Sequence, residues 1–264
     1  RSLPGLADVP MPAEGTLSYH DTIEETVAGA AWIQESVPEQ LELKHQVLAG
    51  IEAAAPATAI IGSSTSGFRP SQLREGARHP GRILVAHPFN PVYLVPVVEI
   101  VGGGEAADRA CAILDGIGMK PVQIAREIDA HIGDRLLEAI WREALWLVHD
   151  GIATTEVIDD IIRYGFGLRW AQMGLFETYR IAGGEAGMRH MLEQFGSALK
   201  LPWTRLVAPE LTEELVDRVV EGCEFQADGR SVAQLEARRD AFLVDLLALV
   251  DKYWPEAVGM RGHI

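Results

Sequence analysis

Apolar positions in the first half of the chain alternate between short runs and longer helical stripes. The short runs at 32–35, 59–62, 82–86, 95–101 and 121–125 predict strands, and stretches at 23–29, 41–55 and 106–118 predict helices between them. From residue 128 onward the pattern is helical only, over 132–145, 155–162, 187–195, 212–221 and 231–253. This organisation predicts an α/β domain with a doubly wound sheet over 1–126, followed by an all-α domain over 127–264.

A histidine and a carboxylate stand at the two ends of one predicted loop-and-strand unit, His87 to Glu99. Because His87 follows an apolar strand, it is expected near the carboxyl end of that strand, where function usually sits in open α/β sheets. Pro88 and Pro91 restrict the loop that also carries Asn90. The pair therefore suggests a general base with its orienting carboxylate, although a single histidine at a strand end is often structural.

Hydroxyl side chains collect at the end of another predicted strand, in Ser63-Ser-Thr-Ser66. Such groups can bind a cofactor amide or a substrate oxygen, or they can satisfy the backbone of a local turn. The motif alone leaves both interpretations open.

These motifs together resemble the 3-hydroxyacyl-CoA dehydrogenase family. Members of that family show a Ser-Asn-Thr-Ser strand end, then His-x-x-Asn-Pro, then a Glu twelve residues after the His, as at Ser66, His87 and Glu99 here. The segment 32–44 resembles the family's segment whose Glu and Lys face the cofactor and substrate, which fall on Glu39 and Lys44. The stretch 169–190 resembles one branch of the family, the enzymes that oxidise L-carnitine.

The resemblance implies an NAD-dependent oxidoreductase with a Rossmann-type dinucleotide-binding domain. In it, His87 would act as general base and Glu99 would orient it, with Ser66 and Asn90 hydrogen-bonding around the reacting oxygen. The residues implied in NAD binding are Glu39, Lys44, Ser66 and Asn90. No metal is implied, and Cys111 and Cys223 are too far apart in sequence to form a ligand motif.

The substrate residues are less well defined by the sequence. Asp134 stands where the family usually has Asn. It helps to accommodate a cationic substrate, takes over the contact of the amide, or simply favours the dipole of a helix N-terminus. Phe166 and Trp170 could present ring faces to a quaternary ammonium, or they could be core residues. Arg180 could bind a substrate carboxylate or form a surface ion pair.

A pyrophosphate-binding turn is expected from the resemblance but not found in this sequence. Gly102-Gly-Gly104 follows the Glu99 strand, and the glycines over 183–187 lie within the helical part, so neither is that turn. The family pattern places two βα units, on the order of 60 residues, before the first predicted strand. We therefore expect that these units are absent from this sequence, and with them the residue that separates NAD from NADP.

Composition narrows the function classes. The chain has 264 residues and a formal net charge of −15, which argues against a nucleic-acid partner and mildly favours a cationic or zwitterionic ligand. No long apolar run or apolar N-terminal segment predicts membrane insertion or secretion, so a cytoplasmic protein is expected. The resemblance also implies a homodimer built on the all-α domain. Two alternatives stay open: another 3-hydroxyacid or 3-hydroxyacyl-CoA dehydrogenase, or a catalytically silent structural protein like the lens crystallin relative of this family.

Overall fold

The computed structural model describes residues 15–183, 187–205, 210, 212–217, 220 and 228–253. The chain divides into two compact units, one formed by 1–135 with 237–264 and the other by 136–236. The predicted domain boundary at 126/127 stays a prediction. Within the described residues no helix is both long and apolar enough to cross a membrane.

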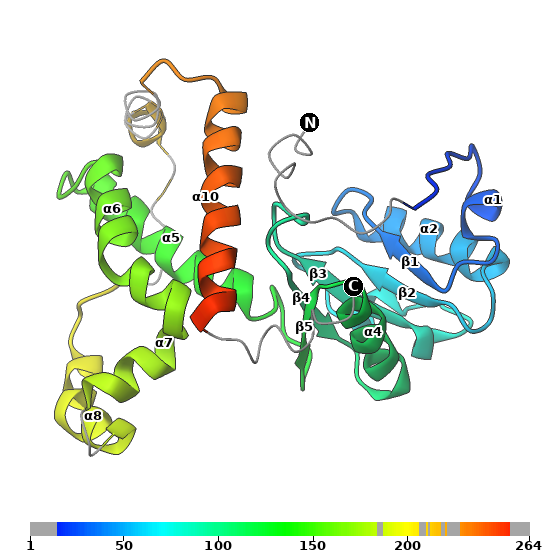
Figure 1. The fold of residues 1–264 in the computed structure, drawn as a ribbon, viewed down its shortest axis with the longest axis horizontal. Helices are drawn as coiled ribbons and strands as arrows, with labels where there is room; N and C mark the ends of the chain where they lie inside the picture. Colours follow the sequence, from blue (N-terminus) through cyan, green and yellow to red (C-terminus); the bar gives the residue numbers. More distant parts are fainter. Residues whose placement is uncertain are drawn as a thin grey trace. The chain divides into compact units, whose positions relative to one another are not determined.

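The first unit is built on one five-stranded sheet with the strand order β1-β2-β3-β4-β5 (Figure 1). Its strands are β1 (Trp32–Glu35), β2 (Ile60–Ser63), β3 (Ile83–Pro88), β4 (Val97–Val101) and β5 (Lys120–Ile124). The pairings β1–β2, β2–β3 and β4–β5 are parallel, whereas β3 and β4 are antiparallel. The carboxyl ends of β2 and β3 therefore share one edge with the amino end of β4.

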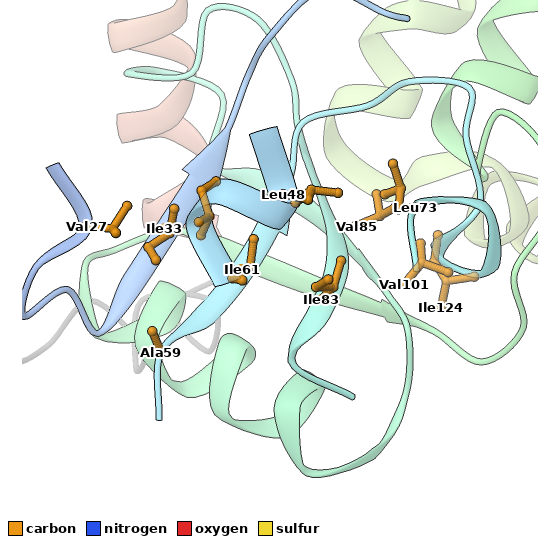
Figure 2. Packing of buried hydrophobic residues seen from close by; sticks show 11 residues of the cluster. Val27, Ile33, Leu48, Ala59, Ile61, Leu73, Ile83, Val85, Val101 and Ile124 are labelled. Atoms are coloured by element: carbon orange, nitrogen blue, oxygen red, sulfur yellow. The ribbon is translucent and has the colours of Figure 1, made fainter. Parts of the chain in front are cut away.

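Helices cover both faces of this sheet. On one face lie α1 (Ile23–Val27), α2 (Leu41–Ala54) and α3 (Pro70–Leu73), and on the other lies α4 (Gly104–Gly116). Alternate residues of the central strands point to opposite faces, so Ile61 and Ile83 join the first core and Ile60 and Leu84 the second. Figure 2 shows the first core, in which Val27, Leu48 and Leu73 of the helices pack on the sheet.

The second unit is helical. It contains most of α5 (Gly133–His149), α6 (Thr155–Ile161), a π-helical turn (Ile162–Phe166), α7 (Gly167–Ala182), α8 (Gly187–Phe195) and a 3-10 turn (Gly196–Lys200). The last helix, α10 (Val232–Tyr253), begins in this unit and continues in the first. Within the unit, the Arg205 guanidinium stacks 4.1 Å from the Trp146 ring and binds the Asp150 carboxylate at 2.7 Å, which joins the loop at 205 to the end of α5.

The predicted α/β-then-α order is confirmed, and each predicted strand is present within two residues of its expected start. His87 differs slightly from expectation, because it lies inside β3 and not beyond it. The helix α7 was not predicted; Gly174, with a φ of 69°, breaks its regularity and interrupts the periodicity. The predicted helix over 212–221 is helical at 213–217, and part of it lies outside the described residues.

Gly62 in β2 marks a close approach between the strands and a side chain. A Cβ built there would lie 2.8 Å from the Cβ of Ala86 and 2.8 Å from the ring of Trp32. We expect Gly62→Ala to lower the free energy of unfolding by about 1–3 kcal/mol, because neither neighbour can retreat within a packed sheet. Chemical denaturation measures this change.

Gly116→Ala is the matched control, since no atom lies within 4 Å of a Cβ built at Gly116 near the end of α4. It should leave the free energy of unfolding unchanged or raise it by up to about 1 kcal/mol. Equal losses in the two variants would contradict the packing argument.

Candidate active site

The register of the antiparallel pair β3–β4 brings His87 and Glu99 together. The two residues are direct partners across the ladder, and His87 Nδ1 lies 2.9 Å from Glu99 Oε2. Both side chains are almost fully buried. The spacing of twelve residues in the sequence is thus the length of chain needed to leave β3, turn and return in register on β4.

The second carboxylate oxygen of Glu99 is held by the backbone at the start of α5. The N–H groups of Ile132 and Gly133 donate to Glu99 Oε1 at 3.0 and 2.9 Å. A carboxylate accepts but does not donate, so His87 Nδ1 carries the proton in the contact with Oε2. In the neutral imidazole, Nε2 is then left with a free lone pair, which is the atom a general base needs.

Two polar groups lie near that lone pair. The Ser66 hydroxyl is 3.1 Å from His87 Nε2 and can donate to it, and an Asp134 carboxylate oxygen is 3.8 Å away. The Asp134 side chain is 27% exposed, whereas that of His87 is 8% exposed. The Nε2 side of the imidazole therefore lies next to a hydroxyl group and to a negative charge on a partly exposed side chain.

The turn that carries Ser66 is clamped by Glu39 from the loop between β1 and α2. Glu39 Oε1 accepts the Thr65 hydroxyl and, at 2.9 Å, the N–H of Gly67. Burial alone would raise the pKa of Glu39, but the hydrogen bonds from Thr65 and Gly67 and the charge of Lys44 outweigh it, so the pKa is lower than usual. Glu39 therefore stays ionised and fixes the residues on both sides of Ser66.

Beneath this turn lies a buried charge network centred on Lys44, whose side chain is 1% exposed. Its ammonium group donates to both oxygens of Glu35 at 3.0 and 3.2 Å and to the Val37 carbonyl at 3.1 Å. Lys44 Nζ also lies 3.4 Å from Glu39 Oε2. The Ser63 hydroxyl donates to Glu35 as well. Lys44 thus helps to hold Glu39, which fixes the Ser66 turn. The contact expected between Lys44 and a cofactor stays a prediction.

The structure gives no contact with this cluster for the predicted site residue Asn90, and it does not place three other predicted site residues relative to the cluster. Asn90 is exposed in the loop after β3, and no hydrogen bond of its side chain is found within the described part of the chain. Phe166 and Trp170 lie in the second unit, where their ring centroids are 4.5 Å apart. The Arg180 side chain is outside the described residues. The roles expected for these residues stay predictions.

Two residues of the site were missed from the sequence. Glu35 occupies the last position of β1, and its carboxylate is the main partner of Lys44. In the sequence, only its place at the end of a predicted strand could have indicated a role at the site. His131 is completely buried, with its ring centroid 5.4 Å from that of His87. A histidine just before a predicted helix gives no distinct signal in a single sequence.

Comparison with known proteins places this chain in a family. The model for the NAD binding domain of 3-hydroxyacyl-CoA dehydrogenase matches residues 10–128, and the model for the C-terminal domain of the same enzymes matches residues 131–222. The chain belongs to the 3-hydroxyacyl-CoA dehydrogenase family.

Its relatives include proteins of the carnitine branch. A protein of Agrobacterium fabrum named L-carnitine dehydrogenase/betainyl-CoA thioesterase is 66% identical over 90% of this chain and 49% of its own length. The L-carnitine dehydrogenase of Oceanobacillus iheyensis is 59% identical over 92% of this chain and 80% of its own length. The resemblance to this branch is thereby confirmed, and the chain spans about half the length of the first of these relatives.

Solved structures agree on the fold. An NAD+ dependent dismutase, 5-formyl-3-hydroxy-2-methylpyridine 4-carboxylic acid 5-dehydrogenase, matches with a TM-score of 0.74 at 24% identity, over 94% of this chain and 82% of the other. At that identity the match supports the architecture alone.

The Glu39 clamp predicts an acid-dependent contribution to stability. Because the pKa of Glu39 is lowered from its ordinary value of 4.5, its ionised form stabilises the fold above that pH, and the contribution is lost as the pH falls below it. At pH 7, Glu39→Gln should lower the free energy of unfolding by about 1 kcal/mol, a modest figure because the side chain is partly exposed. Urea titrations at neutral and acidic pH measure the difference.

As the pH falls below 4.5 and then through the lowered pKa of Glu39 in the fold, the gap in stability between the variant and the parent protein should shrink, since the carboxyl becomes protonated first in the unfolded and then in the folded state. Glu42→Gln, on the exposed side of α2, is the matched control and should change little at either pH. A loss for Glu39→Gln that is independent of pH would argue against the charged clamp.

Proposed function

We propose that the protein oxidises the 3-hydroxyl of L-carnitine to give 3-dehydrocarnitine, with NAD as the hydride acceptor. The observation that carries the proposal is the His87 Nε2 lone pair, which lies beside both the Ser66 hydroxyl and the Asp134 carboxylate. The names of the L-carnitine dehydrogenase relatives support the choice of substrate.

In this proposal His87 is the general base. Its Nε2 accepts the proton of the substrate hydroxyl as the carbon–hydrogen bond of the same carbon gives up a hydride. The imidazolium that forms is stabilised by Glu99, which keeps its hydrogen bond to Nδ1 throughout. The Ser66 hydroxyl then turns to donate to the substrate oxygen, which becomes a carbonyl oxygen.

NAD supplies the acceptor carbon for the hydride in this reaction. The donor and acceptor groups at the carboxyl edge of β1 and β2 fit the nicotinamide end of such a cofactor. Glu39 is 44% exposed and can accept from ribose hydroxyls, and Ser66 can bind the carboxamide. Asn90, exposed in the next loop, is a further candidate, and Lys44 acts through Glu39.

Asp134 is proposed to recognise the substrate cation. In L-carnitine the trimethylammonium group sits on the carbon next to the one that bears the hydroxyl. A substrate whose hydroxyl meets His87 Nε2 must therefore place its positive charge near a carboxylate only 3.8 Å from that nitrogen. A quaternary ammonium cannot donate conventional hydrogen bonds, so charge and ring faces must hold it, and we propose Phe166 and Trp170 for the latter. Arg180 is proposed for the substrate carboxylate.

We also propose a cytoplasmic homodimer assembled through the helical unit. Within that unit, α5 and α6 expose large apolar side chains and line a cavity of about 370 Å³. Exposed apolar surface of this kind supports an interface between two copies.

The general-base role predicts the behaviour of two variants of the full-length protein. His87→Gln should lower kcat by about 10² to 10⁴ with little change in affinity for NAD, because only the proton acceptor is lost. Glu99→Gln should lower kcat less, through the weaker hold on the imidazole. Steady-state kinetics and NAD titration by fluorescence provide both numbers, and near-normal turnover of His87→Gln would show that another group is the base.

The role of Asp134 predicts a change in substrate preference. Asp134→Asn keeps the shape of the side chain but removes its charge, so kcat/KM for L-carnitine should fall by about ten-fold or more. The neutral analogue in which carbon replaces the ammonium nitrogen should be turned over no worse by the variant than by the parent protein. An equal fall for both substrates would indicate a general catalytic role in place of cation recognition.

The parent protein should show weak or undetectable reduction of acetoacetyl-CoA, because its net charge of −15 disfavours a ligand that carries several phosphate charges. A kcat/KM for the CoA thioester above that for L-carnitine would favour a 3-hydroxyacyl-CoA dehydrogenase, and no turnover of either would favour a silent structural protein.

A further inference from the structure

His131 is a second imidazole at the site, and the mechanism above does not use it. Its side chain is fully buried, and its ring centroid lies 5.4 Å from that of His87 at an interplanar angle of 49°. Its backbone adopts a φ of 49°, in the left-handed region that residues other than glycine rarely occupy. Strained backbone of this kind persists where the surroundings enforce it, and it often marks a functional position.

The contacts of His131 indicate which of its ring nitrogens carries a proton. Its Nε2 lies 3.0 Å from the Thr65 carbonyl oxygen, and because a carbonyl only accepts, Nε2 carries the proton. Its Nδ1 is buried and has no hydrogen-bond partner among the residues that the structure describes. A charged imidazolium would place a second N–H in that position without an acceptor, which is unfavourable. The geometry therefore fits the neutral form.

The carbonyl that His131 holds belongs to the turn that presents Ser66. Glu39 holds the same turn from the other side, through the Thr65 hydroxyl and the Gly67 N–H. The next two residues after His131 donate their N–H groups to Glu99. The segment 131–133 thus touches both elements that the reaction needs, the Ser66 turn and the carboxylate that orients His87.

We propose that His131 is a positioning residue: as a neutral imidazole, it holds the Thr65 carbonyl so that the Ser66 hydroxyl stays in line with His87 Nε2. A neutral ring also leaves the positive charge that develops on His87 unopposed by a like charge. Two carboxylates lie next to the His87 ring, Glu99 at Nδ1 and Asp134 3.8 Å from Nε2, and both favour that developing charge. This inference rests on the proposed oxidation at His87.

Two variants of the full-length protein separate positioning from packing. His131→Phe keeps a ring of similar size but cannot donate to Thr65, whereas His131→Gln can place an amide N–H near the same carbonyl. We expect His131→Phe to lower kcat for L-carnitine by about ten- to a hundred-fold, with the KM for NAD changed by less than about two-fold. His131→Gln should recover most of the lost kcat.

His45→Phe is the matched control. The His45 ring also contacts a backbone carbonyl through Nε2, that of Gln72 at 2.7 Å, but it lies on α2 and outside the site. The His45→Phe variant loses the same kind of hydrogen bond as His131→Phe, and its kcat should stay close to that of the parent protein. Equal kcat in His131→Phe and His45→Phe, or a His131→Gln variant as slow as His131→Phe, would overturn the proposal.

A spectroscopic measurement tests the inference without turnover. In ¹⁵N-labelled parent protein at pH 7, His131 should show a protonated Nε2 and an unprotonated Nδ1, with the signals assigned by their loss in His131→Gln. Two protonated ring nitrogens, or a proton on Nδ1 only, would overturn the proposal even if His131→Phe failed to fold. This result is independent of the substrate, so a parent protein inactive on L-carnitine would refute the proposed function and leave the outcome for His131 readable.

Discussion

The rest of the site depends on the hydrogen bonds that the Glu99 carboxylate accepts from His87 and from the backbone. One of its oxygens sets the tautomer of His87, and the other receives two backbone N–H groups from the chain that enters α5. This arrangement is possible because β4 runs antiparallel to β3 and returns directly opposite His87. In an all-parallel sheet the same sequence would place Glu99 elsewhere, and the imidazole would lack an orienting group.

The buried charge of Lys44 near this centre is matched by opposite charge and by hydrogen-bond acceptors. Lys44 is surrounded by the Glu35 carboxylate, a carbonyl and Glu39, so its burial is compensated by close opposite charge and by hydrogen bonds. The apolar cores on the two sides of the sheet hold β1, β2 and β3 rigidly, and the polar network occupies only their carboxyl ends. Rigid strands and a shared edge position the Ser66 turn relative to His87 to within hydrogen-bonding distance.

The sequence predicted the layout of the fold well because strands and helices of the first unit are strongly periodic. It also predicted the pair His87–Glu99, since a histidine and a carboxylate at the ends of one strand unit are visible as a spacing. It could not predict that Lys44 is buried, because nothing local to a helix tells which face meets Glu35. Nor could it reveal His131, whose position results from a left-handed backbone between two distant segments. The helix α7 was missed because Gly174 interrupts its regular pattern.

The backbone groups that bind Glu99 belong to the chain just before and at the first residue of α5, where a helix normally leaves its N–H groups without intrahelical partners. Glu99 thus serves α5 as a terminal acceptor supplied by the sheet. The amide hydrogens of Ile132 and Gly133 are consequently shielded from exchange with solvent by a side chain of the His87–Glu99 pair and not by the helix itself. The hydrogen-exchange rates of these two amides therefore report how often their contacts with Glu99 open in the folded protein, with no need for substrate turnover.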